Sequence, residues 1–381
     1  MMQYLEYDHK KIKWIGQSPV DQTFLIAPLS KTAPVMIFDN KGNLLKQAST
    51  AGYPSMFRQL PDLSGYYYTA GNAEVKSSRF AEYRSNGRYL LGPLFITDNN
   101  LDVVTTVDFL PTTYCSNIIG IHSHCNLVLG KNHYLIQYIA FNTVTIDGKE
   151  TYVVNCGIQE QLNNKIIWEW NTIDEPSLYA ESHFNNNFWD EIMVSKKCAC
   201  DYAHMNSMVK TSDGKYIYIS LKNIGIIKLD YNTKKIIWKI GKLCKDSLKI
   251  PEGKVMFAHQ HDLRLVDDNT LYFWDNENAC YTLISVVDNV VTKYETFSVE
   301  KNYKKANMGN VVKVADNIID ICYGLRHPLI PSVFMQPIMT EVDMKTGEVL
   351  VSLTMALGNE YEPLLNVMYQ INRGVNVYED E

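Results

Sequence analysis

The stretch from Tyr216 to Gly241, YIYISLKNIGIIKLDYNTKKIIWKIG, contains three runs that are rich in β-branched and aromatic residues. A short gap separates the first run from the second, and a polar Tyr-Asn-Thr-Lys-Lys turn separates the second from the third. Runs of this length and composition, bounded by turn residues, are typical of β-strands. The stretch therefore predicts three consecutive strands.

The same arrangement returns along the chain, in TFLIAPLSKTAPVMIFDNKGNLLKQ (23–47), YLLGPLFITDNNLDVVTTVDF (89–109), TLYFWDNENACYTLISVVDNVVTKYETF (270–297) and PIMTEVDMKTGEVLVSLTM (337–355). Short strands that recur about every forty to fifty residues are typical of the four-stranded blades of a β-propeller. Almost no segment has the pattern of a long amphipathic helix. The repeats indicate an all-β fold.

We predict a six-bladed β-propeller formed by residues 1–381 as a single domain, with an irregular insertion near residues 177–197. The blades are expected near residues 15–50, 62–112, 120–173, 202–242, 256–300 and 305–357. A pair of sandwich or barrel domains is the alternative. No linker or change of composition divides the chain, and closure into a ring removes exposed strand edges.

Charge and composition limit the classes of partner. The net charge is −6, and Lys and Arg are scattered along the chain, so no basic surface for nucleic acid is expected. No apolar run is long enough for a membrane helix, and the N-terminus has no signal-peptide pattern. Eight dispersed cysteines favour reduced thiols in the cytoplasm. A chain that had lost a leader peptide would instead be periplasmic or secreted, and the oligomeric state stays open.

Three histidines occupy similar positions in three predicted blades. His124, His204 and His261 each stand at the start of a first strand, about six to nine residues before a polar turn. The first strands of a propeller line its central channel, so we expect the three imidazoles to meet at one mouth. His259 precedes His261 by two residues, and strand alternation would direct it to the same side.

Three segments resemble characteristic segments of the arylsulfotransferase family: VVNCGIQEQLNNKIIWEWNTID (153–174), DYAHMNSMVKTSDGKYIYISLKN (201–223) and QHDLRLVDDNTLYFWDNEN (260–278). The resemblance implies a propeller that moves a sulfuryl group from an aryl sulfate ester to a phenol, without a nucleotide donor. It implies that His261 is the nucleophile that becomes a sulfohistidine, while His124 and His204 hold sulfate oxygens. The arginine that the family uses for the same purpose falls on Lys222, and no metal or other cofactor is implied.

The chemistry suits these residue types, because a neutral imidazole is a competent nucleophile near neutral pH and its adduct divides one difficult displacement into two easier ones. Tyr202 and Phe257 are candidates to stack on a phenolic substrate, and His259 is a candidate to contact it. Two departures stand out. Cys125 replaces the carboxylate that the family often has after its first channel histidine, and Lys222 lacks the planar fork of arginine.

Two other classes of function stay open. A lyase, cyclase or isomerase would use the same histidines as acids and bases. A non-catalytic propeller would bind a protein or a small ligand and would not need channel histidines. An assay with a sulfate-ester donor separates sulfuryl transfer from both.

Overall fold

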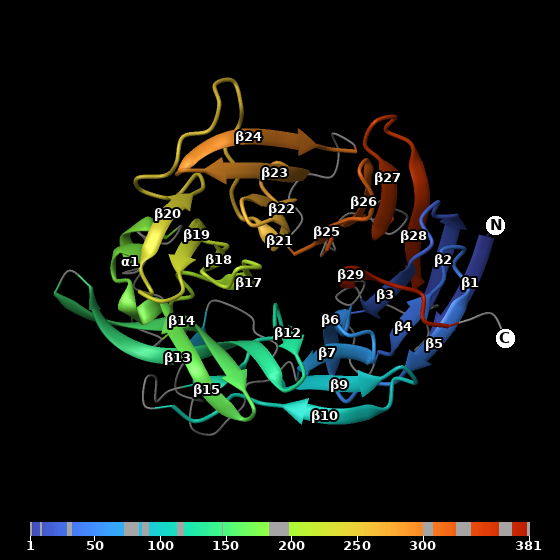
Figure 1. Ribbon diagram of the computed structural model, residues 1–381, viewed down its shortest axis with the longest axis horizontal. Helices are drawn as coiled ribbons and strands as arrows, with labels where there is room; N and C mark the ends of the chain where they lie inside the picture. Colours follow the sequence, from blue (N-terminus) through green and yellow to red (C-terminus); the bar gives the residue numbers. More distant parts are fainter. Residues whose placement is uncertain are drawn as a thin grey trace.

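The fold is described by a computed structural model of the chain, which defines residues 2–7, 10–28, 33–71, 84–85, 91–112, 118–146, 148–182, 198–299, 308–324, 337–357 and 368–378. Within these residues, six sheets of four or more strands stand around a central axis (Figure 1). The predicted all-β, six-bladed propeller is confirmed. The predicted insertion begins with helix α1 (Ser177–Glu181), and residues 183–197 lie outside the described residues.

Residues 216–241 form the three outer strands of the fourth blade. Strands β17 (Met205–Lys210), β18 (Tyr216–Leu221), β19 (Gly225–Asp230) and β20 (Ile236–Ile240) pair antiparallel in this order, with β17 nearest the axis. The β-branched residues of β18 and β19 are buried between neighbouring blades. The Asp230 carboxylate accepts hydrogen bonds from the backbone N and Oγ1 of Thr233, which closes the last turn.

Three further blades follow the same plan. The second contains β6 (Tyr53–Gln59), β7 (Gly65–Gly71), β9 (Leu94–Asp98) and β10 (Val103–Val107). The third contains β11 (Ile118–Ile121), β12 (Leu127–Gly130), β13 (His133–Ile146), β14 (Lys149–Leu162) and β15 (Lys165–Asn171), followed by the short helix η1 (Thr172–Asp174). The fifth contains β21 (His261–Asp267), β22 (Thr270–Asp275), β23 (Cys280–Val287) and β24 (Val290–Phe297). A short parallel pair joins β8 (Arg84–Ser85) to β16 (Cys198–Ala199).

The two ends of the chain complete the remaining blades. In the first blade, β3 (Thr23–Pro28), β4 (Val35–Phe38) and β5 (Leu44–Ala48) receive their inner strand from the far end of the chain, β29 (Met368–Gly374). In the sixth, β25 (Asn310–Lys313), β26 (Ile318–Cys322), β27 (Met339–Asp343) and β28 (Val349–Leu357) are extended outward by β2 (Lys10–Gly16) and β1 (Met2–Tyr7). The sequence analysis did not anticipate this exchange.

A buried charge cluster reinforces the closure. Arg373 on β29 donates from Nε to Asp320 Oδ2 at 2.6 Å, and its guanidinium also contacts Glu341 on β27. The side chains of the two acids are 1% and 0% exposed. Ser18 donates from Oγ to Glu341 Oε2 at 2.8 Å. The last strand is thus attached to the sixth blade as well as to the first.

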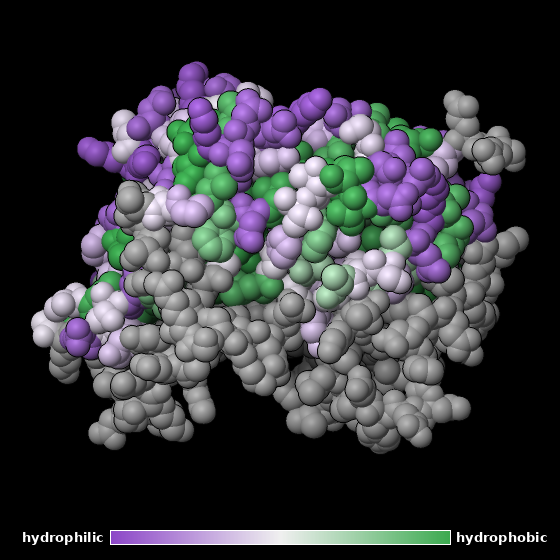
Figure 2. Space-filling view, turned by 90° about the horizontal axis from the view of Figure 1, so that it is seen from below, coloured by the Kyte–Doolittle hydropathy of each residue, from purple (hydrophilic) through white to green (hydrophobic). Residues whose placement is uncertain are grey.

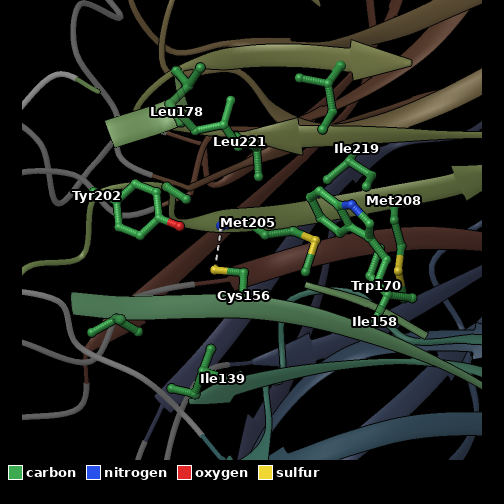
Figure 3. Close-up of a cluster of buried hydrophobic side chains, with 14 of the residues drawn as sticks. Ile139, Cys156, Ile158, Trp170, Leu178, Tyr202, Met205, Met208, Ile219 and Leu221 are labelled. Atoms are coloured by element: carbon green, nitrogen blue, oxygen red, sulfur yellow. Dashed lines mark hydrogen bonds between the residues drawn. The ribbon is translucent and has the colours of Figure 1, made fainter. Parts of the chain in front are cut away.

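Hydrophobic residues fill the spaces between blades. Figure 3 shows the cluster between the third and fourth blades, where Ile158 and Trp170 face Met208 and Ile219. The Met205 backbone N–H donates to Cys156 Sγ at 3.4 Å within this cluster. On the coloured part of the surface in Figure 2, hydrophilic and hydrophobic residues are interspersed. None of the helices in the described residues is long and apolar enough to cross a membrane.

Candidate active site

The inner strands of three consecutive blades begin at the same end of the ring and bring His124, His204 and His261 together. His124 precedes β12, His204 immediately precedes β17, and His261 is the first residue of β21. The ring centroid of His124 lies 5.2 Å from that of His204 and 5.5 Å from that of His261. These three residues, distant in sequence, therefore form one cluster, and their catalytic roles stay a prediction.

Burial keeps His261 and His124 in the neutral form. Burial lowers the pKa of His261 to about 4, against the opposing effect of the Asp262 carboxylate, and the positive charge of Lys222 adds to the lowering. Burial also holds the pKa of His124 well below its ordinary value, with further contributions from the neighbouring histidines and Lys222. Both imidazoles therefore have an unprotonated ring nitrogen at neutral pH.

His204 is held by a carboxylate from its own segment. Its Nδ1 contacts Asp201 Oδ2, and the Asp201 side chain is 4% exposed. The backbone of His204 has a φ of 50°, in the left-handed region, which bends the segment just before β17. Asn223 donates from Nδ2 to the Asp201 carbonyl oxygen at 2.8 Å, and this bond ties the bend to the next turn of the blade. The Asp201 contact therefore occupies Nδ1 of His204.

Lys222 belongs to this cluster. Its backbone N–H donates to the His204 carbonyl oxygen at 3.0 Å, so the two residues are adjacent across the blade. Burial lowers the pKa of Lys222, and the charge of Asp201 partly offsets this effect. Its positive charge contributes to lowering the pKa of both His124 and His261. The structure thus places the half-buried Lys222 where the family resemblance expects an arginine.

The sequence analysis missed His122, which is 1% exposed and lies against His124. The two ring centroids are 4.1 Å apart, and His124 Nδ1 lies 2.8 Å from Nε2 and 3.0 Å from Nδ1 of His122. A signal was present, because the His-Ser-His at 122–124 repeats the His-Gln-His at 259–261. Asp201 was also missed, although it lies only three residues before His204, a spacing at which a carboxylate can contact an imidazole.

Asp262, the residue after the predicted nucleophile, anchors the start of β21. Its carboxylate accepts from Arg58 at 3.2 Å and from Arg264 Nε at 2.7 Å, and its side chain is 0% exposed. Gln370 on β29 donates from Nε2 to the same carboxylate at 3.3 Å. These bonds connect the histidine cluster to the second blade and to the closing strand.

Two of the predicted substrate contacts lie in the core instead. Tyr202 is 0% exposed, and its hydroxyl donates to Asn155 Oδ1 at 2.9 Å. Phe257 is also 0% exposed and packs edge to face on Phe273. Both rings are buried in the packing of the core. The expectation was wrong because the sequence does not reveal on which side of the chain the two rings point.

The remaining two predictions concern His259 and Cys125. His259 lies before β21, and its φ of 54° is in the left-handed region. Strand alternation requires extended backbone, so it does not direct His259 to the side of His261. Cys125 Sγ points to the Met208 carbonyl oxygen at 3.6 Å, inside a hydrophobic cluster. A side chain at position 125 therefore does not orient the His124 imidazole in this protein.

Comparisons with known proteins agree with this architecture. The solved structure of a protein of unknown function from Bacteroides caccae matches with a TM-score of 0.51 at 9% identity, over 93% of this chain and 100% of that chain. The β-propeller domain of Cps50 (Swd1) from Myceliophteria thermophila matches with a TM-score of 0.41 at 9% identity, over 95% of this chain and 87% of that chain. At such identities the first likeness shows the fold alone, and the second carries no further weight. No curated protein sequence matches.

The family comparison is more informative. A sequence model described as Arylsulfotransferase (ASST) matches residues 122–323, which is more than half of the chain. The matched region begins at His122 and contains the clustered histidines and Lys222. The chain therefore belongs to the arylsulfotransferase family.

Proposed function

We propose that this protein transfers a sulfuryl group from an aryl sulfate ester to a phenolic acceptor through a covalent adduct on His261. The observation that carries the proposal is the cluster itself: a buried, neutral imidazole together with two further histidines and the half-buried, positively charged Lys222. Family membership supports the class of reaction.

Each chemical step needs a group that the cluster provides. In the first step, the lone pair of a His261 ring nitrogen attacks sulfur, and the bond from sulfur to the aryl oxygen breaks, so that the phenolate leaves with the electron pair. In the second, the acceptor oxygen attacks sulfur and the N–S bond breaks, which returns the lone pair to His261. His204, with Nδ1 against Asp201, is suited to take the acceptor's proton at Nε2.

The surrounding groups stabilise negative charge on the sulfuryl oxygens and the leaving phenolate. Lys222 supplies a positive charge in a half-buried place, where electrostatic interactions are stronger than in water. His124 supplies a ring N–H donor, and His204 can donate from Nε2 once it has taken up the acceptor's proton. Loss of one such donor typically lowers the rate by roughly 10²–10³.

The test is to mix purified protein with a phenyl sulfate ester and no acceptor. We expect a burst of phenol close to one equivalent and the mass of one sulfuryl group on the peptide that contains His261. His261→Ala should abolish the burst and the adduct. The matched control is His133→Ala, which removes a histidine that pairs with Glu160 at 2.7 Å, away from the cluster. If no aryl sulfate in a broad panel is cleaved, or if the adduct forms on another residue, the proposal is wrong.

A second candidate function is supported by the contact between His204 and Asp201. This pair resembles the histidine and carboxylate that perform proton transfer in many enzymes. A lyase, cyclase or isomerase would use it without covalent chemistry at His261. Turnover without any sulfuryl adduct, together with strong dependence on Asp201, would favour this function over sulfuryl transfer.

A further inference from the structure

The segment that carries His261 departs from regular strand geometry. Strand β21 pairs with β22 at His261 and again at Arg264, and the register shifts between the two, so the residues in between leave the regular ladder. His259 and Asp262 have φ values of 54° and 55°, in the left-handed region. Such residues persist where surrounding contacts fix the backbone. The position of His261 therefore depends on contacts beyond the strand ladder.

The fourth blade supplies two of these contacts, one on each side of His261. Asn206 donates from Nδ2 to the Gln260 carbonyl oxygen at 2.7 Å, and Ser207 Oγ accepts from the Leu263 backbone N–H at 2.8 Å. The Ser207 hydroxyl also donates to Asn206 Oδ1 at 3.0 Å, which orients the Asn206 amide. The backbone before and after His261 is thus held by two consecutive, buried residues of β17.

A β-bulge explains how two consecutive residues of β17 reach the same neighbour. Side chains normally alternate between the two faces of a strand. The register between β17 and β18 shifts between Met205 and Ser207, so Asn206 is outside the regular alternation. Asn206 follows His204 by only two residues. These contacts therefore connect the His204 segment to the His261 segment.

Gln260 returns a contact to the strand that leads to Lys222. Its Nε2 donates to the Leu221 carbonyl oxygen at 3.0 Å. Leu221 ends β18 and directly precedes Lys222, whose backbone N–H donates to the His204 carbonyl oxygen at 3.0 Å. Hydrogen bonds therefore connect the backbone beside His261 to the segments of His204 and Lys222.

The same kind of bond recurs at the two preceding junctions between blades. Gln137 of the third blade donates from Nε2 to the Met205 carbonyl oxygen at 2.5 Å, and Ser55 of the second blade donates from Oγ to the Ser123 carbonyl oxygen at 2.9 Å. Met205 and Ser123 are each the direct neighbour of a histidine of the cluster. In each case, a buried side chain of one blade holds the backbone beside the histidine of the next blade.

We propose that Asn206 and Ser207 are positioning residues for His261, which they hold at a fixed place relative to the fourth blade. That blade carries His204 and Lys222, so the nucleophile and the groups that face the sulfuryl donor form one unit. Attack requires the reacting atoms to lie about 3–3.5 Å apart. A displaced His261 would therefore react more slowly, although every group that binds the donor is still present. This role rests on the proposed function.

The kinetic test compares formation of the His261 adduct in the parent, in Asn206→Leu and in Ser207→Ala. Leucine is similar in size to asparagine but has no donor. Alanine removes a single oxygen atom, so this variant keeps the test decisive if Asn206→Leu does not fold. We expect phenol release at saturating phenyl sulfate to slow roughly 10- to 100-fold in Asn206→Leu, the order that a small misplacement costs, and less in Ser207→Ala. The half-saturating donor concentration should change little.

The matched control is Asn171→Leu. Asn171 is also 0% exposed, and it donates from Nδ2 to the Tyr138 hydroxyl oxygen at 3.2 Å and accepts from the Ile173 backbone N–H at 2.9 Å. It ends β15, the outermost strand of the third blade. We expect its Tm to fall about as far as that of Asn206→Leu, with phenol release at the parent rate. An equal loss of rate in this control, or the parent rate in both folded test variants, would overturn the positioning role.

The position of His261 can also be followed without catalysis, by NMR of the full-length protein with ¹⁵N-labelled histidine. The ring signals of His261 are assigned from their loss in His261→Gln. They should shift in Asn206→Leu and Ser207→Ala and stay in place in Asn171→Leu. If the parent cleaves no aryl sulfate, the proposed function fails, and these signals still decide whether β17 positions His261. Unchanged signals in both test variants would overturn the inference.

Discussion

Replacing Arg373 by methionine should weaken closure of the ring more than it weakens any one blade. Arg373 is the cation for two buried acids, Asp320 and Glu341, and its own side chain is 5% exposed. Methionine keeps much of the length of the side chain but removes the charge and all five donors. Two carboxylates would then be left close together and out of water, without a cation and with the Ser18 hydroxyl donating to Glu341.

The expected loss follows from the burial of this cluster. Removing one partner of a buried ion pair costs about 3–5 kcal/mol, because the remaining charge stays buried and uncompensated. Burial and the nearby Asp320 charge already raise the pKa of Glu341. A raised pKa means that the folded state binds this proton more tightly than the unfolded state. The protonated Glu341 therefore contributes to the free energy of unfolding at acid pH, and this contribution is lost as the pH rises through the raised pKa.

The assay is urea unfolding followed by tryptophan fluorescence, at pH 5 and at pH 8. We expect Arg373→Met to lower the free energy of unfolding strongly at pH 8 and less at pH 5, where Glu341, whose pKa is raised, accepts a proton. Adding Glu341→Gln to Arg373→Met should recover part of the loss. Lys215→Met, which breaks an exposed pair with Asp213, is the control and should barely change the urea midpoint.

Two results would contradict this reasoning. One is a variant with the parent urea midpoint at pH 8, which would mean that the buried charges contribute nothing to closure. The other is a loss that is equal at both pH values, which would mean that uncompensated carboxylates are not its cause.

Three further predictions concern the site and the thiols. Lys222→Ala should lower aryl sulfate turnover by roughly 10²–10³, and Lys222→Arg should retain or raise it; an alanine variant as active as the parent would exclude an anion-holding role. Because the pKa of His261 is lowered to about 4, kcat/KM should be constant near neutral pH and fall as the pH approaches that value; a profile that falls already near pH 7 would contradict the assignment. The described cysteines Cys125, Cys156, Cys200, Cys244, Cys280 and Cys322 are free thiols, so a reducing agent should leave Tm nearly unchanged; a drop of many degrees would reveal a structural disulfide.

Local patterns were enough to predict the blade architecture and the location of the histidine cluster. The runs between Tyr216 and Gly241 determine strands through composition and turns alone, and both are local properties. Because inner strands start at one end of a propeller, His124, His204 and His261 could be expected to meet, and their rings are neighbours.

Properties that depend on distant contacts could not be predicted in the same way. No local pattern shows that β29 pairs with β3, since the partners are separated by almost the whole chain. The sequence also does not reveal which side of the backbone Tyr202 and Phe257 occupy, so two core rings were expected at the mouth. His122 was missed because its contact with His124 depends on ring orientations that the sequence does not reveal.

The closure of the first blade by β29 sets an order of events during synthesis. The residues of the histidine cluster leave the ribosome well before residues 368–374, and Asp262 receives its hydrogen bond from Gln370 only after that last strand has been made. Until then β3 has an unpaired inner edge, which is open to pairing with another nascent chain. A chain truncated before residue 368 would therefore contain every catalytic candidate but would lack the strand that closes the ring.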